Sequence, residues 1–174
     1  MNVIFYDIDG VFNTGRTAVA ANQKRLYLDD GQMVPHLDTF AVSFMVQLAK
    51  VANAKLVCSS TWRKLFTLEE IAIAIPIMAG FESIQRDFIA AHAEGDEWRT
   101  GDHSYAHRHK DIDEYIKANK VENFVIFDDK ESAGVGNEEN FILVNAYDGL
   151  TFNDMHKAGE IMGNTKLTAG GFLF

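Results

Sequence analysis

The chain contains 174 residues, of which 47% are hydrophobic and 24% charged, a composition typical of soluble globular proteins and a length that suits one domain. The formal net charge of −9 argues against nucleic-acid binding through a broad basic surface, although it leaves room for a site that binds only a terminal phosphate. Cys58 is the single cysteine and excludes an internal disulfide, and the lack of a signal peptide or of an apolar stretch near the roughly 20 residues of a membrane helix predicts a cytoplasmic protein with no membrane partner.

The first predicted element is a strand over residues 2–6, an apolar run rich in β-branched and aromatic residues that ends in Asp7, Asp9 and Gly10. Neighbouring carboxylates repel one another and need water or a cation. Since ligands bind at the carboxyl ends of strands in an open parallel sheet, this stretch predicts a cation-assisted acidic site. An EF-hand calcium loop is excluded by spacing, because Val11 stands where the third oxygen ligand belongs. A simple strand-to-turn junction is the alternative that only downstream partners can reject.

The middle of the chain predicts a flap and then a helix–strand unit. Residues 14–38 are polar and are expected to form the flap, with a short strand at 25–28 and a turn at Asp30-Gly31. Apolar residues recur at helical spacing from Phe40 to Ala52, with Asp38 or Thr39 as the cap. A second apolar strand follows at 55–58 and ends in the polar run 59–63.

Residues 65–107 leave room for a small insertion. Thr67 and Glu70 have the spacing of a capping box, and Pro76 is expected to close the short helix that they begin. Residues 83–91 could form a strand, although periodicity decides little there. Residues 93–107 are polar and mixed and are expected to be a loop.

The last third predicts a helix defined by Ile112, Tyr115, Ile116 and Asn119 and preceded by the run 108–111. A strand at 124–127 that ends in Asp128-Asp129 and a strand at 141–144 follow. A helix capped by Thr151 follows, and the tail at 167–174 is left unassigned. Strands that alternate with helices indicate an α/β three-layer sandwich with a mainly parallel, Rossmann-like sheet of about five strands. The acids and hydroxyls that follow three of the strands would then meet at one edge of this sheet.

These motifs resemble, in order and spacing over roughly residues 1–150, the four motifs of the haloacid dehalogenase (HAD) superfamily of phosphohydrolases. The motifs are Asp7-Ile-Asp9-Gly-Val, Val57-Cys58-Ser59-Ser60, a basic residue at the start of a helix, and Asp128-Asp129. The runs 59–63 and 108–112 further resemble the phosphatase domains associated with RNA and DNA end repair.

The resemblance implies a Mg²⁺-dependent phosphomonoesterase with little or no cap domain. Asp7 would be the nucleophile that forms an aspartyl-phosphate, and Asp9 would protonate the leaving oxygen and then deprotonate water. Ser59 would donate to the phosphoryl group, with Ser60 and Thr61 as alternatives, and either Arg108 or Lys110 would neutralise its charge. The metal ligands would be Asp7, Asp9, Asp128 and Asp129, and the substrate-binding residues would be Gly10, Ser60, Thr61 and Arg63.

The expected substrate is a phosphorylated nucleotide or a nucleic-acid terminus. A small-metabolite phosphatase and a non-catalytic phosphate-binding module of the same fold are the alternatives. Two other interpretations have less support in the sequence. His103, His107 and His109 could form a transition-metal site, but no ordered ligand pattern supports one. Trp62 and Arg63 could contact a base or a phosphate, or could simply brace a helix start.

Overall fold

A central parallel sheet carries the fold of the computed structural model, which describes residues 1–20, 25–28, 31, 33–102 and 107–163. Its strand order is β4-β1-β5-β6, and each neighbouring pair is parallel. The expected parallel α/β sheet is confirmed, with four strands in the described part of the chain where the sequence predicted about five. The strands are β1 (Asn2–Tyr6), β4 (Ala54–Cys58), β5 (Asn123–Asp128) and β6 (Phe141–Leu143).

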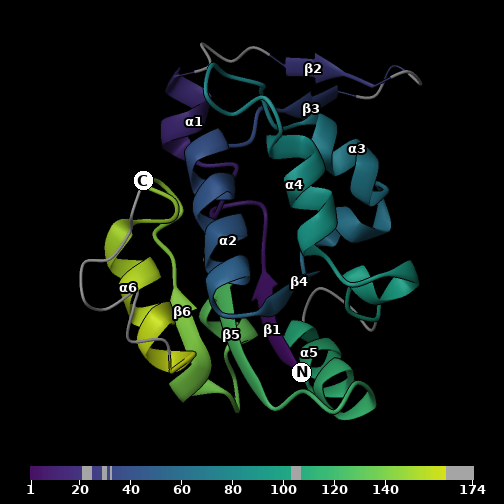
Figure 1. Ribbon diagram of the computed structural model, residues 1–174, viewed down its shortest axis with the longest axis vertical. Coiled ribbons are helices and arrows are strands. Elements are labelled where there is room, and N and C mark those ends of the chain that lie inside the picture. The colour runs from purple at the N-terminus through teal and green to yellow at the C-terminus, as the bar shows by residue number, and fades with distance from the viewer. Residues whose placement is uncertain (21–24, 29–30, 32, 103–106, 164–174) are drawn as a thin grey trace.

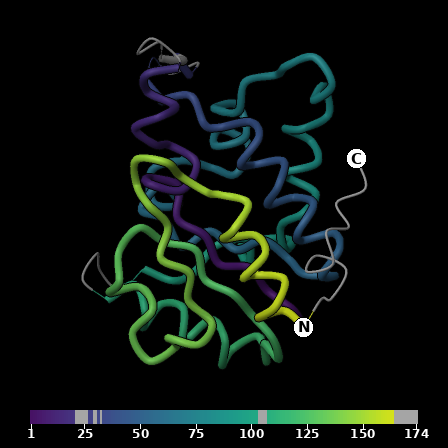
Figure 2. The backbone as a smooth tube through the Cα atoms, turned by 90° about the vertical axis from the view of Figure 1, so that its left-hand side faces the viewer, coloured from purple at the N-terminus to yellow at the C-terminus, as the bar shows by residue number. Residues whose placement is uncertain are grey.

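Helices cover both faces of this sheet. Alternate residues of a strand point to opposite faces, so Ile4 and Tyr6 join the larger core with α2, α4 and α6, while Val3 and Phe5 pack in a second core with α5. Figures 1 and 2 show α2 and α6 on the side opposite α5. None of the helices described is long and apolar enough to cross a membrane. The helices are α1 (Gly15–Ala20), α2 (Thr39–Val51), α3 (Leu68–Ile73), α4 (Ile84–Ala91), α5 (Arg108–Ala118) and α6 (Phe152–Ile161).

Three helices begin where the sequence predicted, at residues whose side chains accept backbone N–H groups. Asp38, not Thr39, caps α2. Both capping boxes form, with Thr67 starting α3 and Thr151 starting α6. These caps satisfy N–H groups that have no partner within the helix.

The strand considered for residues 83–91 is wrong, because this segment forms α4. Ile84 and Phe88 are buried and lie four residues apart, the spacing of one helix face. The expected loop at 93–107 is more ordered than predicted where it is described. It contains a short 3₁₀ helix, η2 (Gly95–Trp98), and isolated bridges join Leu56 to His92 and Cys58 to Arg99 along β4.

The flap region contains α1 and an antiparallel hairpin of β2 (Arg25–Tyr27) and β3 (Met33–Pro35). The hairpin lies at the upper end of the molecule in Figure 1, the end toward which β1 points. Of the predicted turn, Gly31 has a φ of +83° and its N–H donates to the Leu28 carbonyl oxygen, and Asp30 lies outside the described residues. The tail at 167–174 also lies outside them.

A buried histidine contacts the central strand beneath the acidic turn. His92 is 3% exposed, with Nδ1 2.7 Å from the Phe88 carbonyl oxygen and Nε2 2.6 Å from the Tyr6 hydroxyl. Nδ1–H therefore donates to Phe88, and the neutral Nε2 accepts from Tyr6. Burial lowers the pKa of His92 to about 4.

His92→Gln should reduce the acid sensitivity of the fold. In the unfolded chain His92 binds a proton below its ordinary pKa of about 6.5, whereas in the folded protein it binds one only below its lowered pKa of about 4. The stability that His92 contributes is therefore complete above pH 6.5 and is lost as the pH falls toward 4. Between pH 6.5 and 5, the wild type should lose about 1.5 kcal/mol more than His92→Gln in urea denaturation.

The half-exposed His156 of α6 offers the matched control. His156→Gln removes an imidazole that is not buried and so controls for the loss of a histidine side chain as such. Identical pH dependence in the wild type and His92→Gln would contradict a neutral, buried imidazole.

Candidate active site

Polar side chains from three neighbouring strands meet at the carboxyl edge of the sheet. Tyr6 is in register with Cys58 on one side and with Phe127 on the other, so the next residue of each strand lies at the same level. The Asp7 N–H donates to the Phe127 carbonyl oxygen, and the Ser59 N–H donates to the Tyr6 carbonyl oxygen, both at 2.9 Å. The convergence that the alternating pattern predicted is thus observed.

Asp7, Asp128 and Asp129 form a cluster in which one oxygen of each carboxylate lies within 4.8 Å of the others. Asp7 and Asp128 are buried, and Asp129 is partly buried. Burial first, and then the charge of Asp7, raises the pKa of Asp128 to about 7 and also raises the pKa of Asp129. Such a cluster favours a bound cation over three free carboxylates.

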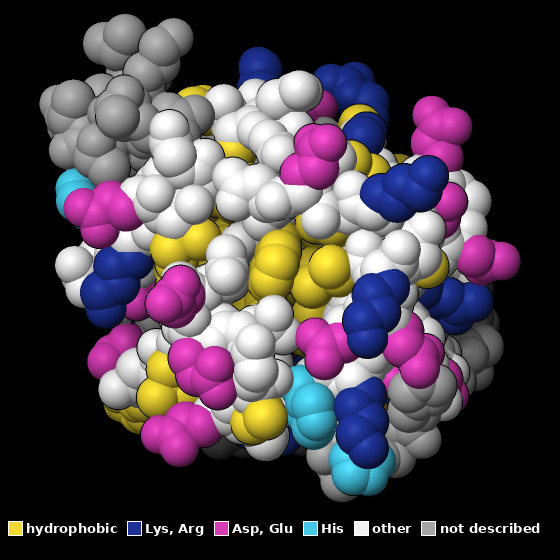
Figure 3. Space-filling model, turned by 90° about the horizontal axis from the view of Figure 1, so that it is seen from below, with side chains coloured by type: hydrophobic (Ala, Val, Ile, Leu, Met, Phe, Trp, Pro, Cys, Tyr) yellow, Lys and Arg dark blue, Asp and Glu magenta, His cyan; other side chains and the backbone are white. Residues whose placement is uncertain are grey.

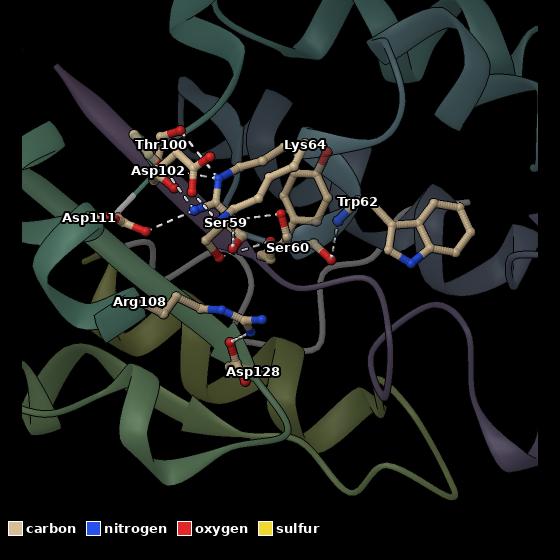
Figure 4. Close-up of polar contacts among 12 residues, drawn as sticks. Ser59, Ser60, Trp62, Lys64, Thr100, Asp102, Arg108, Asp111 and Asp128 are labelled. Carbon is tan, nitrogen blue, oxygen red and sulfur yellow. Dashed lines mark hydrogen bonds and ion pairs between the residues drawn. The ribbon is translucent and has the colours of Figure 1, made fainter. Parts of the chain in front are cut away.

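Arg108, the first residue of α5, supplies one positive charge to the cluster. Its Nη1 donates to Oδ2 of Asp7 at 2.6 Å and also to Oδ2 of Asp128, and Figure 4 shows its side chain directed at Asp128. Burial works against the charge of Arg108, but the two carboxylates outweigh it and raise its pKa, so the guanidinium stays protonated. Lys110 is exposed, and no ion pair between described residues joins it to the cluster.

The remaining carboxylate oxygens show where a metal could bind. Oδ1 of Asp7 accepts the Ile8 N–H, and Oδ1 of Asp128 accepts the Lys130 N–H. Oδ1 of Asp129 is buried and has no hydrogen-bond partner among the described residues. A hard cation such as Mg²⁺, which prefers carboxylate oxygen, fits this donor set.

Gly10 allows the two acidic turns to approach each other. Its φ is +82°, and a Cβ atom there would lie 2.6 Å from Cβ of Asp129. Only glycine accepts this backbone conformation and this contact without strain. The geometry thus gives Gly10 a packing role, distinct from the substrate contact expected for it.

Ser59 and Ser60 are fully buried. The Ser59 hydroxyl donates to the Tyr6 carbonyl oxygen at 3.0 Å, while Ser60 caps η1 (Thr61–Lys64), a 3₁₀ helix, through the Trp62 N–H. Thr61 is half-buried. Of the three hydroxyls, that of Ser59 directly follows β4, the strand paired with β1, which leads to Asp7.

The guanidinium of Arg63 forms its hydrogen bonds with other groups of the same chain. Arg63 is 3% exposed, and its guanidinium donates to the carbonyl oxygens of Ser59, Ser60, Thr100 and Gly101 and to the carboxylate of Asp111. Figure 4 shows Ser59, Ser60, Thr100 and Asp111 gathered in this region. All five N–H groups of an arginine are used by this set. The geometry therefore favours a positioning role over the direct substrate contact expected for Arg63.

Asp9 lies outside the acidic cluster and has its own partners. Its Oδ1 accepts from Nδ2 of Asn13 at 2.6 Å, and its Oδ2 accepts from the indole N–H of Trp62 at 3.0 Å. Sequence reasoning missed both contacts. Trp62 is 53 residues away in the chain, and nothing in the spacing of the two residues connects them.

The histidine site weighed from the sequence gains no support. His107 and His109 lie in ring contact, but within the part of the chain that the structure describes, the metal-capable group contains aspartates and no histidine. His103 lies outside the described residues.

Comparison with known proteins agrees with this geometry. A family model described as the HAD domain in Swiss Army Knife RNA repair proteins matches residues 3–155. No curated protein and no solved structure matches the chain. The matched residues include β1 from Val3 onward, the acidic cluster, Arg108 and the start of α6. The chain therefore belongs to the family of HAD domains found in Swiss Army Knife RNA repair proteins.

Proposed function

We propose that this protein is a Mg²⁺-dependent phosphomonoesterase that acts through an aspartyl-phosphate on Asp7 and removes phosphate from nucleic-acid ends. The observation that carries this proposal is the cluster of Asp7, Asp128 and Asp129 with Arg108 at the carboxyl edge of the parallel sheet. The family match supports it, because HAD domains are generally phosphohydrolases and this family is described by RNA repair.

In the first step, a carboxylate oxygen of Asp7 attacks phosphorus, and the bond from phosphorus to the leaving oxygen breaks. Asp9 gives its proton to that oxygen. Arg108 and the Ser59 hydroxyl, turned from the Tyr6 carbonyl, donate to phosphoryl oxygens and offset their charge.

In the second step, water attacks phosphorus and its proton passes to the Asp9 carboxylate, while the bond from phosphorus to Asp7 breaks and releases phosphate. Asp7, Asp128 and Asp129 would hold Mg²⁺, which when bound reduces the repulsion between the anionic nucleophile and the phosphoryl oxygens. Asp129 is suited to this ligand role because its buried Oδ1 lacks a partner among the described residues.

The surface charge favours recognition of a phosphate end over binding along a strand. The chain has a net charge of −9, and the face seen from below in Figure 3, away from the candidate site, carries acidic and basic side chains intermixed around an apolar centre. Binding along a nucleic-acid backbone needs a stripe of positive charge. Binding of a terminal phosphate needs only the positive charges within the site itself.

The test is phosphate release from a substrate panel in Mg²⁺ and in EDTA. The panel contains 3′- and 5′-phosphorylated oligonucleotides of RNA and DNA, the corresponding mononucleotides and a sugar phosphate. We expect hydrolysis of an oligonucleotide end that stops in EDTA and returns with Mg²⁺. Preference for mononucleotides or sugar phosphates would assign a small-molecule phosphatase, and no hydrolysis of any compound would favour a phosphate-binding module.

A further inference from the structure

The Asp9 carboxylate is held on both sides although Asp9 is an exposed residue. Asn13 donates to one oxygen and Trp62 to the other. A free carboxylate at the surface would sample several side-chain rotamers. Two donors on opposite oxygens select one of these orientations.

Both donors are themselves fixed by the fold. The Asn13 backbone closes the acidic turn, since its carbonyl oxygen accepts the Gly10 N–H at 2.7 Å and its N–H donates to the Ile8 carbonyl oxygen at 2.9 Å. Trp62 is 7% exposed and packs against Phe66 with 5.2 Å between ring centroids. An indole N–H can only donate a hydrogen bond, so Asp9 is the acceptor in its contact with Trp62.

We propose that Trp62 and Asn13 are positioning residues that aim the carboxyl group of Asp9 at the leaving oxygen. This role rests on the proposed function. The proton on Asp9 moves to the leaving oxygen as its bond to phosphorus breaks, and the resulting carboxylate takes the proton of the attacking water. The positioning residues exchange no proton. Their effect is to keep Asp9 in the geometry from which both transfers occur.

The contact can be tested without any assay of activity. The chain has two tryptophans, so an NMR spectrum should show two indole N–H signals, which Trp62→Phe and Trp98→Phe would assign. Asp9→Ala should move the Trp62 signal to higher field and speed its exchange with solvent, because the acceptor is lost. The Trp98 signal should stay in place.

The role is tested by kinetics with two leaving groups. Trp62→Phe keeps an aromatic ring against Phe66 and removes the donor. Its kcat/KM should fall about tenfold on an alkyl phosphate, whose leaving oxygen needs a proton, and much less on 4-nitrophenyl phosphate, whose leaving group does not. Inhibition by inorganic phosphate should be unchanged. If Trp62→Phe folds poorly, Asn13→Ala should show the same larger loss of kcat/KM on the alkyl phosphate than on 4-nitrophenyl phosphate.

Double variants and a matched control complete the test. Trp62→Phe should cause no further loss when added to Asp9→Ala, because both remove one interaction. Trp98→Phe, at the other buried tryptophan, should keep wild-type kinetics with both substrates.

Two failures are distinguishable. An active wild type in which Trp62→Phe and Asn13→Ala lower kcat/KM equally for both leaving groups, or not at all, would overturn the positioning role alone. A wild type that hydrolyses no phosphomonoester would overturn the proposed function and this role with it, whatever the NMR signals show.

Discussion

Asp7→Asn is expected to abolish phosphate release, with kcat reduced by about 10⁴-fold or more, because the amide cannot attack phosphorus and form the covalent intermediate. The change is nearly isosteric, and the amide oxygen of the variant could still accept the Ile8 N–H that Asp7 accepts now. The folded structure should therefore persist. The measurements are phosphate release in Mg²⁺ and mass spectrometry of acid-quenched protein, in which the wild type should carry a phosphoryl group and the variant should not.

Asp148→Asn is the control for this variant. It removes the same charge at an exposed position in the loop after β6 and should keep full activity. Phosphate release by Asp7→Asn at the wild-type rate would contradict a covalent mechanism through Asp7.

Arg63→Met is expected to produce the largest loss of stability, about 3–5 kcal/mol, because it removes one partner of a buried ion pair. Asp111 has a fully buried side chain and would lose its Arg63 partner, which is 2.8 Å away. Four carbonyl oxygens would also lose their donor. Urea denaturation of the wild type and the variant measures the difference.

Arg86→Met provides the matched control, since the Arg86 side chain is 80% exposed and its contact with Asp87 is 3.6 Å long. Exposed pairs contribute about 0–1 kcal/mol. Arg63→Lys should also lose stability, because an ammonium group cannot reproduce the planar fork of donors. Equal midpoints for Arg63→Met and Arg86→Met would contradict the structural role of Arg63.

The sequence predicted the elements whose patterns are local. The apolar run before Asp7 and the one before Asp128 each indicate a strand, and parallel pairing then brings their ends together. Capping is local as well, which is why the helix starts after Asp38, Thr67 and Thr151 could be predicted. These two kinds of signal define the sheet, and with it the edge where the acidic cluster lies.

The sequence could not resolve what depends on contacts between distant segments. Arg108 and Lys110 lie two residues apart at one helix start, and only the packing of α5 directs Arg108 at the carboxylates. Arg63 has the residue type of a phosphate ligand, but the 100–101 backbone and Asp111 enclose it. The helical spacing of Ile84 and Phe88 was missed, because two apolar positions in a short segment leave the period ambiguous.

The segment from His92 to Arg99 affects whether other protein chains can pair with the edge of the sheet. In the sheet formed by the described residues β4 is an edge strand, and an uncovered edge strand exposes backbone groups with which a strand of another chain can pair. Bridges at Leu56 and Cys58 place this segment along that margin, and the Thr100 N–H donates to the Cys58 carbonyl oxygen at 3.0 Å. A strand of another chain could pair with this edge of β4 only after displacing the segment. The segment therefore protects the edge strand against aggregation.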